Sequence, residues 1–320
     1  MILKGVAGLL APGGKGARLS ILIFHRVLAQ PDPLFPGEQD ARRFDEVLSW
    51  VARWFQVMPL DQAVSQLAAG TLPARAAAIT FDDGYADNAT QALPLLKQHG
   101  MTATFFIASS FLDGGRMWND SVIEMVRAHQ GKAVDLSDIG LGVHSLETHQ
   151  QRAAAIDSLL GQIKYLEPRK RRETVFAIEK LADALLPSDL MMTAVQVKQL
   201  HREGMQIGAH TCSHPILARV TDDEAQNEMR AGKVALEALI GDEVALFAYP
   251  NGRPGKDYLA KHAVMAKQIG FKAAVTTAPG TSSPATDLFQ LPRFSPWDKT
   301  PLRYGARMLS NLRINHPQMA

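Results

Sequence analysis

Short apolar runs alternate with amphipathic stretches along most of the chain. Runs of strand length occupy residues 19–27 (LSILIFHRV), 56–60 (QVMPL), 76–81 (AAAITF), 101–109 (MTATFFIAS), 205–211 (MQIGAHT), 244–250 (VALFAYP) and 272–277 (KAAVTT). Runs of this length, with apolar residues at every position or every second one, predict buried β-strands.

The stretches between these runs carry apolar residues at helical spacing. In residues 41–55, for example, Phe44, Val47, Leu48 and Val51 share one helix face. Helices are also expected in the stretches 61–70, 87–100, 193–204, 222–241 and 256–270. Strands separated by helices imply parallel βα units, so the pattern predicts a distorted (β/α) barrel of about seven parallel strands.

The alternation is interrupted once, between residues 113 and 189. This segment is charged and helix-rich and contains no clear strand, and its basic run EPRKRRE (167–173) is most simply a solvated helix face. We therefore expect an N-terminal extension at 1–18, a barrel at 19–300 with a helical insertion at 113–189, and a C-terminal tail at 301–320.

Composition excludes several classes of protein. The 320 residues are 46% hydrophobic and 21% charged. The net charge of +2 is too small to indicate a surface that binds nucleic acid. A single cysteine, Cys212, excludes an internal disulfide and agrees with a reducing compartment. No apolar run approaches the roughly 18 residues of a membrane span. The weak leader-like stretch after Lys4 is interrupted by proline and glycine. The expectation is a cytoplasmic protein, with export left open.

Two short motifs carry the candidate chemistry. Asp82 and Asp83, followed by Gly84, come at the end of a predicted strand, where adjacent carboxylates repel one another. His210 and His214 follow another strand, four residues apart. Taken alone, neither stretch requires a functional site: the first is explained by a turn and the second by a histidine-rich surface loop.

Together the motifs predict a metal site. Two imidazoles and one carboxylate form a recurrent hydrolytic zinc set, and the ends of parallel strands meet at one mouth of a barrel. With Asp83, His210 and His214 on the ion, the repulsion between the two carboxylates falls. Asp82 is then free to act as general base toward a water molecule.

The ordered pair TFDDG (80–84) and HTCSH (210–214) resembles the polysaccharide deacetylases of carbohydrate esterase family four, the NodB-homology domain. The resemblance covers residues 19–297 and is poorest over the insertion. It implies Asp82 as catalytic base, a divalent metal (usually zinc) on Asp83, His210 and His214, and a carbohydrate substrate.

One family motif departs from the usual pattern. In FAYPNG (247–252), Ala248 stands where an arginine commonly pairs with the catalytic aspartate, and Asn251 stands where an aromatic residue is common. The Asn251 N–H can still serve the oxyanion. Arg293 in LPRFSPW is our candidate for the missing arginine. Tyr249, Pro250 and Asn251 are expected at the substrate.

The family's closing histidine motif is also missing. His316 lies in a polar tail, whereas His25 ends the first predicted strand, so the chain resembles the permuted deacetylases that act on poly-N-acetylglucosamine. The resemblance implies His25 as general acid. Trp118 and Trp297, with Tyr249, are candidate aromatic surfaces for sugar rings, although tryptophans are more often core residues.

The sequence thus predicts a metal-dependent hydrolase that removes N-acetyl groups from an N-acetylated glycan. A deformylase, an O-acetyl esterase and a non-catalytic carbohydrate-binding protein on the same fold are alternatives. A glycosidase with two carboxylates is disfavoured, because its carboxylates stand at least ~5 Å apart across the scissile bond.

Overall fold

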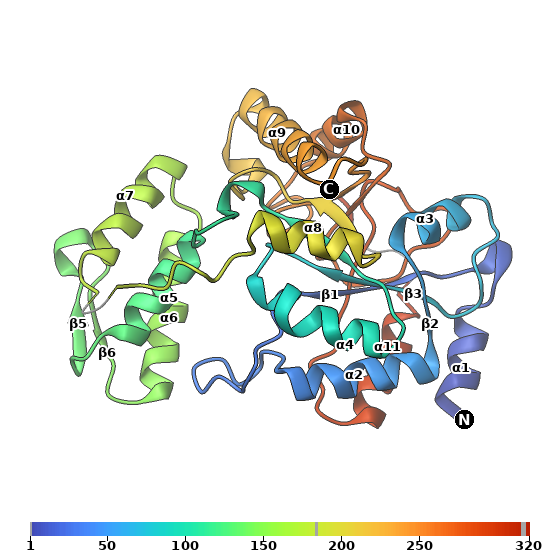
Figure 1. Cartoon of the computed structure of the whole chain (residues 1–320), viewed down its shortest axis with the longest axis horizontal. Helices are drawn as coiled ribbons and strands as arrows, with labels where there is room; N and C mark the ends of the chain where they lie inside the picture. Colours follow the sequence, from blue (N-terminus) through green and yellow to red (C-terminus); the bar gives the residue numbers. More distant parts are fainter. Residues whose placement is uncertain (1, 183–184, 315–317) are drawn as a thin grey trace.

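A seven-stranded, curled parallel sheet forms the centre of the computed structural model, which describes residues 2–182, 185–314 and 318–320. The strand order is β1-β3-β4-β7-β8-β9, and β2 pairs with the start of β3 (Figure 1). All seven predicted strands are present, and the predicted fold class, a distorted (β/α) barrel, is confirmed. The strands are β1 (Ser20–Phe24), β2 (Gln56–Val57), β3 (Ala76–Phe81), β4 (Thr104–Ile107), β7 (Gln206–Ala209), β8 (Leu246–Ala248) and β9 (Ala273–Val275).

Strict alternation along the strands builds two apolar layers. In β3, Ala76 and Ala78 belong to a cluster inside the curl of the sheet, whereas Ala77, Ile79 and Phe81 belong to the larger cluster under the helices. Successive side chains of a strand point to opposite faces, so this parity decides which later residues reach the barrel mouth. Thr80 and Asp82 continue the inner series of β3.

Helices cover the outside of the sheet. They are α2 (Ala41–Trp54), α4 (Leu93–Gln98), α8 (Ala194–Arg202), α9 (Asp222–Ile240) and α10 (Ala260–Ile269). Helix α3 (Leu60–Ala68) packs instead into the inner cluster, through Leu60, Ala63, Val64 and Leu67. Helices α1 (Ile2–Leu10) and α11 (Pro301–Asn311) pack against each other and against α2, so much of the expected tail is helical. Among the residues that the structure describes, no helix has the length and apolar character needed to cross a bilayer.

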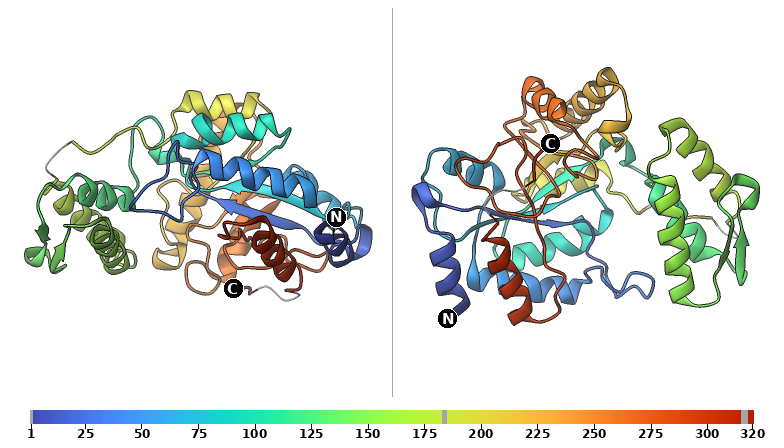
Figure 2. Two further views of the ribbon diagram at one scale, coloured as in Figure 1. Left: turned by 90° about the horizontal axis from the view of Figure 1, so that it is seen from below. Right: turned by 180° about the vertical axis from the view of Figure 1, so that it is seen from behind.

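The insertion stands beside the barrel as a separate lobe, drawn in green in Figures 1 and 2. It contains α5 (Trp118–Ala128), α6 (His149–Ile163) and α7 (Pro168–Glu179) around their own apolar cluster. It also contains an antiparallel pair, β5 (Ala133–Asp135) and β6 (Val143–Ser145), so the expectation of no strand here is wrong. The domain limits drawn from the sequence remain a proposal.

The segment after β9 fills the gap between the first and last strands. Leu19 and Ser282 form an antiparallel bridge, and the Phe294 N–H donates to the Ile21 carbonyl at 2.9 Å. The Ile23 N–H donates to Ser295 Oγ at 2.8 Å. These bonds hold Arg293 against the inner face of the first strands.

Candidate metal centre and active site

The predicted site residues follow the carboxyl ends of neighbouring parallel strands. His25 follows β1, Asp82 and Asp83 follow β3, His210 follows β7 and Asn251 lies three residues beyond β8. Because all these strands run in the same direction, their ends meet at one mouth of the barrel.

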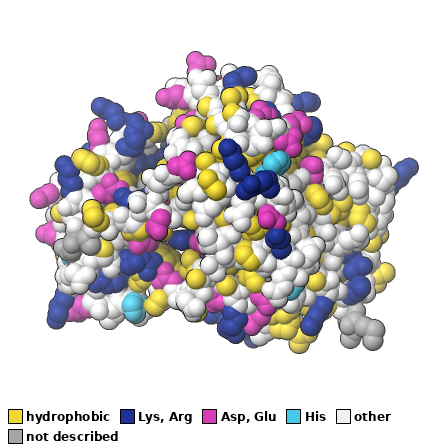
Figure 3. Space-filling view, viewed as in Figure 1, with side chains coloured by type: hydrophobic (Ala, Val, Ile, Leu, Met, Phe, Trp, Pro, Cys, Tyr) yellow, Lys and Arg dark blue, Asp and Glu magenta, His cyan; other side chains and the backbone are white. Residues whose placement is uncertain are grey.

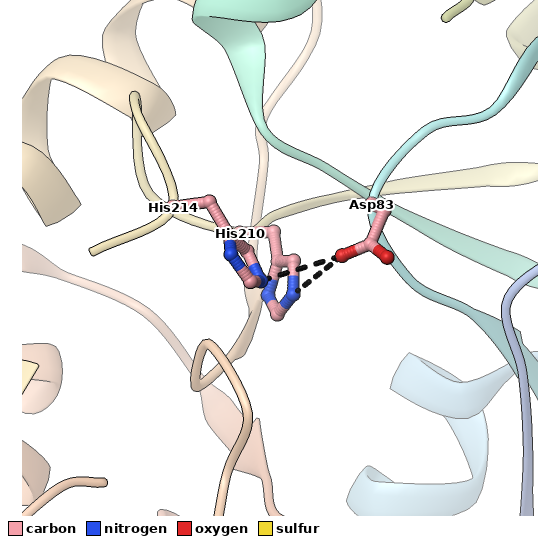
Figure 4. A group of neighbouring side chains, drawn as sticks. All are labelled: Asp83, His210 and His214. Atoms are coloured by element: carbon pink, nitrogen blue, oxygen red, sulfur yellow. Dashed lines mark ion pairs between the residues drawn. The ribbon is translucent and has the colours of Figure 1, made fainter. Parts of the chain in front are cut away.

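Asp83, His210 and His214 come together as a buried group (Figure 4). Asp83 Oδ1 lies 3.4 Å from His210 Nε2 and 3.3 Å from His214 Nε2. One donor atom from each residue fits within 4.8 Å of the others. His210 Nδ1 is 2.7 Å from the Ala248 carbonyl, which can only accept, so Nδ1 carries a proton and Nε2 is the ring nitrogen that faces Asp83. This donor set fits a divalent metal ion such as zinc.

Burial sets the charge state of the two histidines. It lowers the pKa of His214 to about 3, so this ring is neutral and available as a ligand. Burial also opposes the charge of His210, but the Asp82 charge and the hydrogen bond with Asp83 outweigh it, and the pKa of His210 is raised. A metal ion at His210 Nε2 would therefore compete with a proton for this nitrogen.

The ligand loops have strained backbones that neighbouring groups hold in place. Asp83, Thr211 and His214 have φ values of +76°, +63° and +55°, a region that residues other than glycine rarely adopt. At the end of β4, the Ala108 N–H donates to the Asp83 carbonyl at 3.2 Å, and the Ser110 N–H donates to the Cys212 carbonyl at 2.9 Å. The end of β4 thus joins the two ligand loops.

Glu228 on α9 is a site-supporting residue that sequence reasoning missed. Its Oε2 accepts from the Cys212 N–H at 3.0 Å and the Ser213 N–H at 2.7 Å, and its Oε1 accepts from Ser213 Oγ at 2.7 Å. One turn later, a Cβ on Gly232 would lie 2.5 Å from the Thr211 carbonyl oxygen, so only glycine allows this close approach. The only sequence signal was a glycine inside a strongly helical stretch.

Asp82 is held by Arg293 in a buried, two-pronged ion pair. The Nη1 and Nη2 groups donate to its two oxygens, each at 2.6 Å, and the two side chains are almost wholly buried. Arg293 Nε donates to the Thr276 carbonyl at 2.9 Å, and Nη1 also donates to Thr80 Oγ1 at 3.1 Å. Burial alone would raise the pKa of Asp82, but Arg293 and His210 outweigh it and lower that pKa.

A cavity of about 350 Å³ opens above the metal ligands and Asp82. His25, Asn251 and Trp118 line it together with other residues of the barrel and the insertion. The His25 side chain is exposed to this space. No acceptor within the described residues receives the Asn251 N–H, and this residue has a φ of +60°.

Tyr249 does not face the cavity, which corrects the expectation that its ring offers a surface to a sugar. The ring is fully buried, stacks on Tyr258 at 3.9 Å and donates its hydroxyl to the Phe289 carbonyl at 2.9 Å. It has the outward parity of Phe247 in β8, and it packs under the helices. Pro250 is buried, and its carbonyl accepts from the Gly252 N–H at 2.7 Å.

Trp297 is also placed away from the metal cavity. It is 66% exposed, its ring lies 4.1 Å from the Arg307 guanidinium, and it lines a separate surface cavity with residues 31–43. Trp297 lies outside the barrel mouth, because the next residue, Asp298, accepts a hydrogen bond from Arg43 of α2 through its carbonyl oxygen. His316 lies outside the described residues.

Comparisons with known proteins agree on one family. The profile described as "Polysaccharide deacetylase" matches residues 69–152 and 161–274. YxkH of Bacillus subtilis, which carries the name of a polysaccharide deacetylase, is 22% identical over 281 residues, 87% of this chain and 71% of its own.

Solved structures share the fold. The deacetylase PplD of Streptococcus pyogenes matches with a TM-score of 0.61 and 19% identity, over 93% of this chain and 99% of its own. IcaB of Ammonifex degensii matches with a TM-score of 0.60 and 17% identity, over 95% and 98%.

Proposed function

Because the chain belongs to the polysaccharide deacetylase family, we propose that it is a metal-dependent hydrolase that removes N-acetyl groups from an N-acetylated glycan. The observation that carries the proposal is the juxtaposition of two differently partnered aspartates. Asp83 lies against two histidines, whereas Asp82 lies beside them on an arginine. Asp83 and the two histidines are thus the proposed metal ligands, and Asp82 is a separate general base.

Asp83, His210 and His214 would hold the ion, with zinc the expected metal. When bound, such an ion acts as a Lewis acid that polarises a carbonyl oxygen and lowers the pKa of water. The buried, neutral ring of His214 and the orientation of His210 Nε2 toward Asp83 support this assignment.

The remaining steps belong to side chains and backbone of this chain. Asp82, fixed by Arg293 and ionised, takes the proton of the attacking water. The Asn251 N–H donates to the carbonyl oxygen as charge develops on it. His25, at the open side of the same cavity, protonates the departing amine.

The ion pair bears on the non-catalytic alternative. The alanine at position 248 favours that alternative, because it leaves the base without the family's usual arginine. Arg293 reaches Asp82 from the segment after β9 with two 2.6 Å hydrogen bonds, and this supports a working base.

Mass spectrometry of poly-N-acetylglucosamine fragments after incubation with zinc-loaded protein tests the proposal. We expect masses to fall by whole acetyl groups, with chelated protein and Asp82→Asn as controls. General-base loss should lower turnover roughly 10²- to 10⁴-fold while zinc stays bound. Shortened chains would indicate a glycosidase, and unchanged masses with intact zinc would return the chain to the binding-protein alternative.

A further inference from the structure

The metal cavity continues into a cleft between the barrel and the insertion. A second cavity of about 280 Å³ shares His25 and Asp83 with the first and extends between the loop after β1 and helix α5. In Figure 3 the surface is indented between the insertion at the left and the barrel. The space therefore extends well beyond the acetyl group that reacts at the metal.

Hydrogen bonds at two places join the insertion to the barrel beside this cleft. The Tyr85 hydroxyl, just after the Asp83 turn, donates to Asp120 Oδ1 of α5 at 3.0 Å. At the end of α6, the Tyr165 hydroxyl donates to Asp257 Oδ1 of the barrel at 3.3 Å. Asp120 and Asp257 are both buried, so the acceptors of these two hydrogen bonds are shielded from water.

The insertion side of the metal cavity is formed by Trp118, Leu160, Gly161 and Lys164. Arg171 of α7 braces this wall from behind. Its guanidinium lies 5.3 Å from the Trp118 ring, and its Nη1 donates to the Lys164 carbonyl at 3.3 Å. Arg171 is itself buried, so the solvated-face expectation fails at this position of the basic run.

Gly161 has no packing or backbone reason to be glycine. It lies in the last turn of α6 without a positive φ, and an added Cβ would meet nothing within 4 Å. Glycine inside a helix lowers its stability relative to alanine. Gly232, by contrast, is required because the Thr211 carbonyl approaches it. What Gly161 provides is empty space on the cavity side.

We propose that the insertion side of this cleft is a subsite for a sugar residue adjoining the one that is deacetylated, and that Gly161 keeps it open. The proposal rests on the proposed function for the identity of the reacting group. A braced aromatic ring and an apolar Leu160 suit the C–H face of a pyranose. The Asn119 amide and the Lys164 ammonium, which line the same cavity, suit its hydroxyl oxygens.

Binding titrations with metal-free full-length protein test the subsite without any need for turnover. Wild-type protein should bind a tetramer of N-acetylglucosamine more tightly than the monosaccharide. Gly161→Leu should weaken tetramer binding roughly tenfold or more, because the new side chain fills the subsite, and should change monosaccharide binding much less. Trp118→Ala, which removes the ring instead of filling the space, should weaken tetramer binding in the same direction.

Gln162→Leu is the matched control, because this neighbour adds the same side chain on an exposed position of α6 that does not line the cavity. It should bind both sugars as the wild type does. Equal affinity of the wild type for tetramer and monosaccharide would overturn the proposal, as would unchanged tetramer binding in a folded Gly161→Leu variant. Selective tetramer binding without release of acetate would instead refute the proposed function and leave the subsite standing.

Discussion

Replacing Arg293 with methionine tests the charge balance on which the site depends. The change keeps much of the side-chain volume but leaves Asp82 with an ionised carboxylate in a buried place and without its two 2.6 Å donors. Removing one partner of a buried ion pair costs about 3–5 kcal/mol. Since whole domains are stable by only about 5–15 kcal/mol, the loss is a large share of the total.

A double-mutant cycle separates the ion pair from simple packing. The free energy of unfolding is measured in urea for metal-free wild type, Arg293→Met, Asp82→Asn and the double variant. In the Asp82→Asn background Arg293→Met removes a guanidinium that already lacks its carboxylate partner and leaves no ionised carboxylate behind, so the change should cost about 1–3 kcal/mol less than in the wild type. Additive costs would show that Arg293 stabilises the fold without supporting Asp82.

The pH dependence of stability provides the second measurement. The folded-state pKa of Asp82 is depressed, so its ionisation stabilises the wild type above the unfolded-state pKa and this contribution disappears as pH falls through the folded-state pKa. Without the guanidinium the folded-state pKa of Asp82 rises toward or above its unfolded-state value, so the loss of stability on acidification should become smaller or reverse. The acidic limb of the rate profile should move to a higher pH, and an unchanged stability profile and rate profile would refute the reasoning.

Three further changes address other parts of the site. His25→Ala should slow deacetylation of N-acetylglucosamine oligomers roughly 10²- to 10⁴-fold but spare much aryl acetate hydrolysis, because an amine is the poorer leaving group; equal losses would remove His25 as the acid. Glu228→Ala should weaken zinc binding roughly 10- to 100-fold in chelator competition, because it removes the acceptor of the Cys212 and Ser213 N–H groups, and Glu228→Gln should restore it. The exposed neighbour change Asn227→Ala is the control. Unchanged affinity in Glu228→Ala would show that the ligand loop keeps its conformation without Glu228. Burial raises the pKa of Asp120 from 3.8 to about 6, so the folded state binds this proton more tightly than the unfolded state does. As pH rises from about 4 to 7, the free energy of unfolding of the wild type should therefore fall by up to roughly 3 kcal/mol relative to that of Asp120→Asn. Parallel stability curves for the metal-free proteins would contradict this sign.

The sheet could be predicted because the local pattern and the tertiary structure agree. AAAITF becomes β3 over the same six residues, and helix α2 begins and ends within a residue of its predicted limits. Burial on both faces of parallel strands gives long apolar runs that few other structures explain. The same property hides which alternate side chains of a strand face inward, and for this reason the expectation that Tyr249 faces the substrate is wrong.

The supporting contacts of the site could not be predicted, because they join distant segments. Glu228 reaches a loop about fifteen residues away through one face of a helix, and that helix has several acidic residues of equal appearance. Arg171 lies in a basic run whose other arginines are exposed, and only the fold of the insertion buries it against Trp118. Arg293 was found from a gap in a motif rather than from its own surroundings.

The adjacency of Asp82 and Asp83 is explained by the backbone between them. Asp82 keeps the inward parity of β3 and points to Arg293, while the left-handed conformation of Asp83 turns its carboxylate toward the histidines. Each carboxylate thus has its own positive or metal-binding partner, which reduces the repulsion between the two negative charges. Because the guanidinium comes from the segment after β9, the hydrogen-bonding partner of the base lies outside the metal loops. A chain without an arginine at position 248 can therefore keep the two carboxylates in separate roles.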